Sequence, residues 1–304
     1  MKPYLLRFHR WLTLLFAMPW IVILVTGLIL SFEPIAMDRA FTGRSISPAA
    51  VEQALATHDP DRKASTLNIR AYDNAIILSQ GRTPLARVDA TTGQKIEPAR
   101  GLWADVFTTS RRLHESLMLD MKWLVDASTI AMLVSILFGL FMGLPVLRNT
   151  LGGWHRMVAW GTLPLLILSP LTGLAIAYGI TFTGPMARPE GPPPTLAEAV
   201  RIIGATHDMA SVYWIRPMGG ALRARIYDGR VAKVFTVTKS GLVTGAQSWP
   251  RAIHEGNWAG VWSGLVNVLT SLALIGLMFT GLWIWARRSL RLRANRRARA
   301  ATAA

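Results

Sequence analysis

Four histidines lie beside apolar stretches of the sequence at repeated positions. His9 and His155 each open an apolar run, and a Thr-Gly-Leu sequence follows each of them at the same spacing. His114 and His254 are each followed by glutamate and then by a further apolar run. Two neutral imidazoles that face each other across a helical bundle can supply both axial ligands of a b-type haem, without any cysteine. The four histidines are therefore candidate ligands of two haems.

Depth in a membrane groups the same histidines into two pairs. His9 and His155 are expected at the inner rim of the bilayer, and His114 and His254 at the outer rim. A rim histidine is also a common interfacial anchor, but four of them repeated in register favour ligation. His58 and His207 belong to a different repeat, Ala-Thr-His-Asp, at the ends of polar helices. We interpret these two as capping or surface residues.

The elements that must position the histidines are membrane-spanning helices. Hydrophobic residues make up 51% of the 304 residues, only 16% are charged, and the mean hydropathy is +0.32. That balance indicates a membrane protein with some polar mass, because an ordinary soluble domain carries about a quarter charged residues. Each apolar run is long enough to cross a bilayer. The expected spans are residues 11–32, 124–147, 155–178 and 261–285.

Internal repetition sets the expected architecture. The repeated motifs divide the chain into similar halves, about 1–148 and 149–304, each ordered apolar helix, polar segment, apolar helix. The fold class is therefore membrane α-helical, a bundle of four transmembrane helices built from two similar halves. Each polar segment predicts a small α+β module. Helices are expected at 47–57 and 195–206, strands at 68–77, 83–88, 212–226 and 231–237, turns at 89–93 and 238–241, and an extended Pro/Gly linker at 184–194.

Charge predicts the orientation. The formal net charge is +16, but seven arginines lie in one tail, residues 287–299, directly after an apolar helix. Lys2, Arg7 and Arg10 precede the first span. Because positive residues stay on the cytoplasmic side, both termini are expected there and both polar segments on the opposite side. The basic tail is thus a topology signal, and no nucleic-acid partner is expected.

Several classes of chemistry lack their motifs. The chain has no cysteine, which excludes disulfides, thiolate iron–sulfur clusters and covalently attached haem. No Walker sequence, HExxH zinc site or nucleophile elbow is present, so hydrolysis and ATP use are not expected. There is no GxGxxG fingerprint either. Electrons would have to come from a partner, such as a quinol or a cytoplasmic reductase.

Taken together, these motifs resemble the PepSY-associated transmembrane family. The resemblance rests on His-Arg-Trp at 9–11, on the His-Glu pairs before the second and fourth spans, and on the ending Thr-Gly-Leu-Trp-Ile-Trp-Ala-Arg-Arg at 280–288. It implies an iron-regulated protein of the bacterial inner membrane, similar to ferrisiderophore reductases, with PepSY-like modules in the periplasm. It also places two bis-histidine haems b on His9, His114, His155 and His254.

The expected division of the chain follows from these elements. It comprises transmembrane helix 1 (1–34), PepSY-like module 1 (35–112), an outer rim segment with helix 2 (113–148), helix 3 (149–180), PepSY-like module 2 (181–253), an outer rim segment with helix 4 (254–286) and a basic cytoplasmic tail (287–304).

The leading functional hypothesis is electron transfer across the membrane to a periplasmic ferric siderophore or other ferric chelate, in iron uptake. Two alternatives remain open. One is a non-enzymatic PepSY binding or regulatory protein anchored in the lipid bilayer. The other is a proton-coupled transporter, which the scarcity of midplane charge disfavours because Asp126 lies near a span end.

Overall fold

The structure is a computed structural model that describes residues 2–81, 83–96, 102–117, 120–144, 148–183, 189, 191–228 and 231–302. The end of the expected second span, residues 145–147, and most of the expected linker, residues 184–188 and 190, lie outside these ranges. The chain forms two compact units. The helical unit is Met1–Leu30, Ser110–Ile180 and Val266–Ala304, and the sheet unit is Ser31–Thr109 and Thr181–Leu265.

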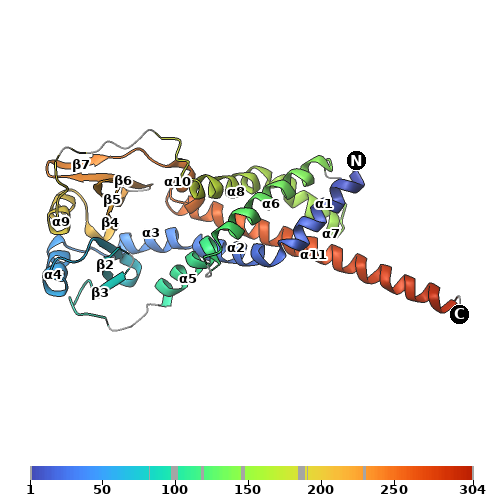
Figure 1. Ribbon diagram of the computed structural model, residues 1–304, viewed down its shortest axis with the longest axis horizontal. Coiled ribbons are helices and arrows are strands. Elements are labelled where there is room, and N and C mark those ends of the chain that lie inside the picture. Colours follow the sequence, from blue (N-terminus) through green and yellow to red (C-terminus); the bar gives the residue numbers. More distant parts are fainter. Residues whose placement is uncertain are drawn as a thin grey trace. The chain divides into compact units, whose positions relative to one another are not determined.

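The helical unit has a core of its own. Buried side chains from four helices form it, and these helices lie side by side in Figure 1: Trp20 and Leu24 from α2, Ala131 and Met132 from α6, Leu166 from α8, and Ala273, Leu274 and Met278 from α11. Trp20 also donates its indole N–H to the carbonyl oxygen of Ser128, 2.8 Å away on α6. The helices of this unit are α1 (Lys2–Leu15), α2 (Ala17–Leu30), α6 (Lys122–Phe141), α7 (Leu151–Gly161), α8 (Leu163–Ala177) and most of α11 (Val261–Thr302), and α5 (Leu102–Ser116) ends in it.

Length and composition identify the membrane spans. Ala17–Ala40, Lys122–Phe141 and Val261–Thr302 are each long and apolar enough to cross a bilayer, and a fourth span results if α7 and α8 count together. The α7–α8 pair bends by 63°. Pro164 near the start of α8 has no N–H to donate to the preceding turn, which accounts for the break. The expectation of a membrane helical protein is confirmed at this level.

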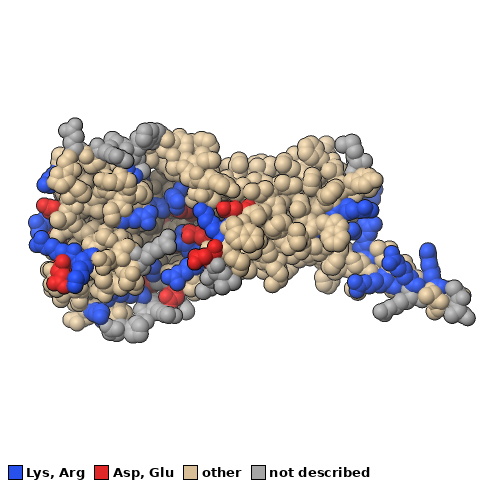
Figure 2. Space-filling model, viewed as in Figure 1, with Lys and Arg blue, Asp and Glu red and all other residues tan. Residues whose placement is uncertain are grey.

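The surface of the helical unit is largely apolar. Large hydrophobic side chains such as Met18, Phe141 and Leu269 are more than half exposed. In the space-filling view most of these helices carry neither sign of charge, while Lys and Arg gather where α11 continues toward the C-terminus (Figure 2). Lipid chains are the environment that such a surface requires. α11 continues as a helix after residue 286, to Thr302. The sequence predicted only the charge of this tail and no helix.

The sheet unit is built on one antiparallel sheet of seven strands. Their order is β3-β2-β1-β4-β5-β6-β7. The helices α3 (Glu33–Gly43), α4 (Pro48–His58), α9 (Leu196–Gly204) and α10 (Trp249–Glu255) accompany it (Figure 1). The strands are β1 (Thr66–Arg70), β2 (Ala75–Gln80), β3 (Thr83–Asp89), β4 (Val212–Met218), β5 (Ala221–Asp228), β6 (Val231–Thr238) and β7 (Gly241–Thr244).

The two polar segments share this sheet. Strands β1 to β3 come from the first segment and β4 to β7 from the second, and β1 pairs with β4 through Leu67–Ile215 and Asn68–Trp214. Two separate modules were expected from the sequence. The structure joins them because β1 and β4 both bury one face on the same core, which includes Leu67, Ile69 and Ile215.

Local signals explain the helices that cover the core. Ser47 caps α4 by accepting the backbone N–H of Ala50 (3.2 Å), and Thr195 with Glu198 forms a reciprocal capping box on α9. The two helices then approach closely. A Cβ on Gly204 of α9 would lie 2.3 Å from Cγ of Pro48, the first residue of α4. Glycine is therefore required at this contact.

Candidate functional site

His9 is held by the second helix of its own half. It lies on α1, and its Nδ1 is 2.9 Å from both the carbonyl oxygen and the hydroxyl of Ser135 on α6. A carbonyl oxygen only accepts hydrogen bonds, so the bond to it requires the proton on Nδ1. The lone pair then lies on Nε2.

His114 shows the same arrangement on a different pair of helices. It lies on α5, and its Nδ1 is 3.0 Å from the carbonyl oxygen of Ile23 and 3.2 Å from Oγ1 of Thr26, both on α2. The Thr26 hydroxyl donates its single proton to its own helix, at Val22 O (2.6 Å). It can therefore only accept from His114, which again places the proton on Nδ1.

His155 repeats the pattern in the second half of the chain. It lies on α7, and its Nδ1 is 2.8 Å from Oγ1 of Thr280 on α11. Thr280 donates its own proton to Gly276 O, 2.6 Å away, and accepts the imidazole N–H.

His254 lies in the sheet unit, whereas the other three candidate histidines lie in the helical unit. It is half-buried in the last turn of α10, which ends at Gly256 in the left-handed conformation (φ 69°). The neighbouring Glu255 is bound by two arginines, Arg225 at 2.6 Å and Arg251 at 2.7 Å. The ion pair with Arg225 of β5 fixes α10 to the sheet, and the pair with Arg251 lies within α10. The pairing of His254 with His114 stays a prediction from the sequence.

The threonine and glycine of the Thr-Gly-Leu repeats accompany two of these histidines. A Cβ on Gly27 would lie 3.2 Å from Cε1 of His114, and one on Gly281 would lie 3.5 Å from Cε1 of His155. Nothing in the sequence singled out Ser135, and the regular spacing linked Thr-Gly-Leu to His9 and His155 within one helix rather than to histidines on neighbouring helices. The recurrence of Thr-Gly-Leu at residues 26–28 and 280–282 indicated a shared role, but its spacing did not identify the histidine that each copy contacts.

The chemistry of the three imidazoles is the same. Each has its Nδ1 proton directed at an oxygen on a neighbouring helix, which orients the ring and leaves Nε2 as the basic nitrogen. This is the tautomer and support that metal-binding histidines use in proteins. Among the described residues no group of three or more His, Asp or Glu could hold a bare metal ion. A haem iron needs only two side-chain ligands, because the porphyrin supplies the other four.

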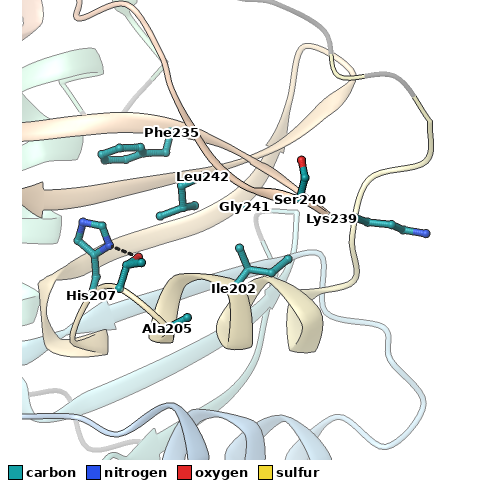
Figure 3. A pocket seen from close by; sticks show the side chains of 9 residues that line it. Ile202, Ala205, His207, Phe235, Lys239, Ser240, Gly241 and Leu242 are labelled. Atoms are coloured by element: carbon teal, nitrogen blue, oxygen red, sulfur yellow. Dashed lines mark hydrogen bonds between the residues drawn. The ribbon is translucent and has the colours of Figure 1, made fainter.

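His58 and His207 serve the sheet unit. His58 ends α4, and its Nε2 lies 2.9 Å from the carbonyl oxygen of Gly93 in the turn after β3. His207 contacts Oγ1 of Thr206 at 2.8 Å and packs against the ring of Phe235, with centroids 5.8 Å apart. Figure 3 shows His207 and Phe235 facing each other across one end of a pocket of about 540 Å³ between α9 and the β6–β7 hairpin.

The aspartate of the second Ala-Thr-His-Asp repeat joins the two polar segments. Asp208 accepts the backbone N–H of Ile46 (2.9 Å) and of Ala210 (2.8 Å), as well as the hydroxyl of Ser45. Partial burial alone would raise the pKa of Asp208. The hydrogen bonds from Ser45, Ile46 and Ala210 outweigh that effect and lower the pKa. The Ala-Thr-His-Asp repeat at 205–208 therefore has a structural role, which agrees with the interpretation of its residues as caps.

A comparison with protein families identifies the family of the chain. Residues 6–288 match the model of the PepSY-associated TM region. The chain belongs to the PepSY-associated transmembrane family. A search of curated protein sequences found no match. The matched range includes all four candidate histidines and both polar segments. Membership in the PepSY-associated family identifies the chain as a multi-pass membrane protein.

Proposed function

We propose that this member of the PepSY-associated family is a di-haem b membrane protein that reduces ferric chelates outside the cytoplasm. The observation that carries the proposal is the common state of His9, His114 and His155. Each has Nδ1 bound to an oxygen of a neighbouring helix and its lone pair on Nε2. Interfacial anchoring would not require one tautomer in three places.

The histidines assigned to each haem follow the sequence. His9 and His155 would hold one haem, and His114 and His254 the other. A bound haem supplies one-electron chemistry between its ferric and ferrous states. The chain's own contribution is to fix the rings of the ligands and to keep the site dry, through the buried Ser135, Thr26 and core residues such as Leu166.

The reaction takes one electron per iron. Fe(III) in the chelate gains the electron and becomes Fe(II), which hard oxygen ligands hold far less tightly. The electron comes from a quinol or from a cytoplasmic reductase, and the iron chelate is a ferric siderophore or a similar complex. Release of Fe(II) then serves iron uptake.

The orientation in the membrane is part of the proposal. Lys2, Arg7 and Arg10 precede the first span, and α11 carries its arginines to Thr302. These charges favour both termini in the cytoplasm of a bacterium and the sheet unit in the periplasm. A reporter enzyme that is active only in the periplasm, fused after Thr302, is expected to stay inactive.

A second candidate function is a non-enzymatic, membrane-anchored binding protein. The pocket beside His207 favours it, since a cavity lined by Ile202, Phe235 and Leu242 can hold an apolar ligand. This role leaves the shared tautomer of the three membrane histidines without an explanation. The reductase is therefore the stronger proposal.

The deciding experiment is a reduced-minus-oxidised absorption spectrum of the detergent-purified protein with a pyridine haemochrome count. We expect two b haems per chain, and their reoxidation when a ferric chelate is added. Protein that stays colourless after expression with ample haem would overturn the reductase proposal and leave the binding role.

Thr280→Val tests the support of His155. Valine keeps the shape of threonine but removes the oxygen that accepts the Nδ1 proton. Loss of such a supporting hydrogen bond weakens metal affinity about 10- to 100-fold, so the haem held by His155 is expected to dissociate more readily and to change its midpoint potential. Haem retention during dilution and a potentiometric titration measure both effects.

Thr270→Val is the matched control on the same helix. Thr270 is buried and, like Thr280, donates to its own helix, at Val266 O (2.8 Å). This variant is expected to keep the wild-type haem content and potentials. Equal behaviour of Thr280→Val and Thr270→Val would contradict a role for Thr280 in positioning His155.

A further inference from the structure

The face of the sheet that points away from α4 and α9 carries a group of arginines. Ile215 of β4 and Ala224 of β5 pair with each other and are fully buried in the core. Neighbouring positions on a strand point to opposite faces. The pairs on the other face are Arg216–Arg223 and Trp214–Arg225. Three guanidinium groups therefore share one side of two adjacent strands.

Arg223 is buried on this face of the sheet. Only 6% of the residue is exposed, and Nε has no hydrogen-bond partner in the described part of the chain. Its guanidinium reaches the hairpin turn, since a Cβ on Gly219 would lie 3.3 Å from Nη2. No carboxylate pairs with it among the residues that the structure describes. A buried charge in this state is costly unless something compensates it.

Arg216 stands beside Arg223 and is exposed. Its guanidinium lies over the ring of Trp214, 4.2 Å from the centroid. Stacking occupies the flat face of the guanidinium and leaves the N–H donors at its edge available. Within the described parts of the chain, no hydrogen bond or ion pair uses them. Although the residue is exposed, partial desolvation of its guanidinium, and then the positive charges of Arg251 and Arg225, lower the pKa of Arg216.

The local charge is unbalanced. Arg225 and Arg251 both bind Glu255, at 2.6 and 2.7 Å. Among the described residues Arg216 and Arg223 form no ion pair, so Glu255 engages only two of the four guanidinium groups. Arg87 on the same sheet provides the contrast, because it is nearly buried and pairs with Asp73 at 2.9 Å. Arg87 therefore has a carboxylate beside it, whereas Arg223 has none among the described residues.

We propose that Arg216 and Arg223 bind the carboxylate or similar oxyanion groups of the ferric chelate. The planar N–H edge of arginine matches two oxygens of a carboxylate or phosphate group. The inference rests on the proposed function for its choice of ligand, and it narrows the substrate class to chelates that carry negative charge. Arg225 and Arg251 contribute attraction, and Glu255 holds them in place.

Gallium(III) citrate is the probe for this site. Gallium(III) replaces iron(III) in oxygen chelates but is not reduced, so binding is measured without turnover and without any need for haem. With the full chain in uncharged nanodiscs, we expect saturable binding that weakens as salt is raised. Arg216→Gln and Arg223→Gln are each expected to weaken it at least tenfold.

Arg201→Gln is the control variant. Arg201 is exposed on α9, paired with Glu52 at 3.2 Å, and belongs to the helix layer on the core side of the sheet. It is expected to bind the probe like the wild type. Because Arg223→Gln removes a buried group and can impair folding, the exposed Arg216 provides the decisive variant. Unchanged affinity in folded Arg216→Gln would overturn the proposal.

Two further arms identify the source of the oxyanion. Inorganic phosphate is expected to compete only weakly, and anionic lipid in the nanodisc is expected to leave the affinity unchanged. Phosphate that binds as tightly as the gallium complex, or occupancy by anionic lipid, would overturn the assignment to a chelate. A haem-free protein that binds the probe through Arg216 would refute the reductase alone, and a haem-loaded protein that fails to bind would refute this inference alone.

Discussion

Replacing His155 with alanine is expected to lower the haem content from two per chain to one. The substitution removes an imidazole whose ring is fixed by Thr280 at 2.8 Å, and no cysteine is present to replace it. His9→Ala is expected to have the same result, because the two residues are assigned to one haem. The measurement is a pyridine haemochrome count per chain, with the reduced spectrum of the haem that remains.

Double variants test the pairing itself. His9→Ala with His155→Ala should still retain one haem, since both changes affect the same site. His9→Ala with His254→Ala should retain none. If the first double variant lost both haems, the assignment of His9 and His155 to one iron would be wrong although haem binding itself would stand.

His207→Ala is the matched control. Its ring packs on Phe235 in the sheet unit, and its Nδ1 contacts Thr206. Two haems are expected in this variant. A full haem count in both His9→Ala and His155→Ala would refute the assignment of these histidines as ligands.

Gly204→Ala is expected to destabilise the sheet unit by about 1 to 3 kcal/mol. The added methyl group would lie 2.3 Å from Cγ and 2.8 Å from Cβ of Pro48, which is a direct overlap. The proline ring is stiff and begins α4, so relief requires the two helices to separate and expose part of the core. Thermal unfolding of the purified protein, followed by circular dichroism, measures the loss as a lower midpoint.

Gly43→Ala isolates the effect of the contact from that of glycine replacement. Gly43 ends α3, and a Cβ there meets nothing within 4 Å. Its unfolding midpoint is expected to equal or exceed that of the wild type. A Gly204→Ala protein as stable as Gly43→Ala would show that α4 and α9 do not need this close contact.

Local features of the fold could be predicted because their causes are local. Ser47 and Thr195 precede helices as capping residues do, and the alternation near Leu67 and Val234 is that of half-buried strands. The spans followed from apolar length. The break before α8 was not predicted, because the span was expected to be continuous, although Pro164 cannot donate the backbone hydrogen bond that a continuous helix needs.

The joined sheet could not be predicted in the same way. The alternation of apolar and polar residues in β1 predicts that one face is buried, but it does not predict which strand will pair with the free edge of β1. The side chain of Leu67 would be buried equally well in the core of a separate module and in the shared core beside Ile215. The choice depends on a core assembled from both polar segments, which no single stretch of sequence specifies.

The candidate site, too, was predictable only where its features depend on local sequence. Histidine type and spacing indicated the four candidate ligands, but their tautomer depends on Ser135 and Thr280, which belong to other helices. The arginine pair needed the register of β4 and β5. The Gly219-Gly220 hairpin sets that register by joining Met218 to Ala221, and this places Arg216 opposite Arg223.

The pairing of β1 with β4 has a consequence for biosynthesis. β1 cannot pair with β4 until the ribosome has synthesised Ile215, the partner of Leu67. At about 5–20 residues per second, the roughly 150 residues between them take about 8 to 30 s to translate. During that interval β1 already has β2 beside it, while its other edge offers unpaired N–H and C=O groups. Any extended segment of another nascent chain can dock there first. Correct pairing of β1 in the first polar segment therefore depends on how soon β4 of the second segment is synthesised.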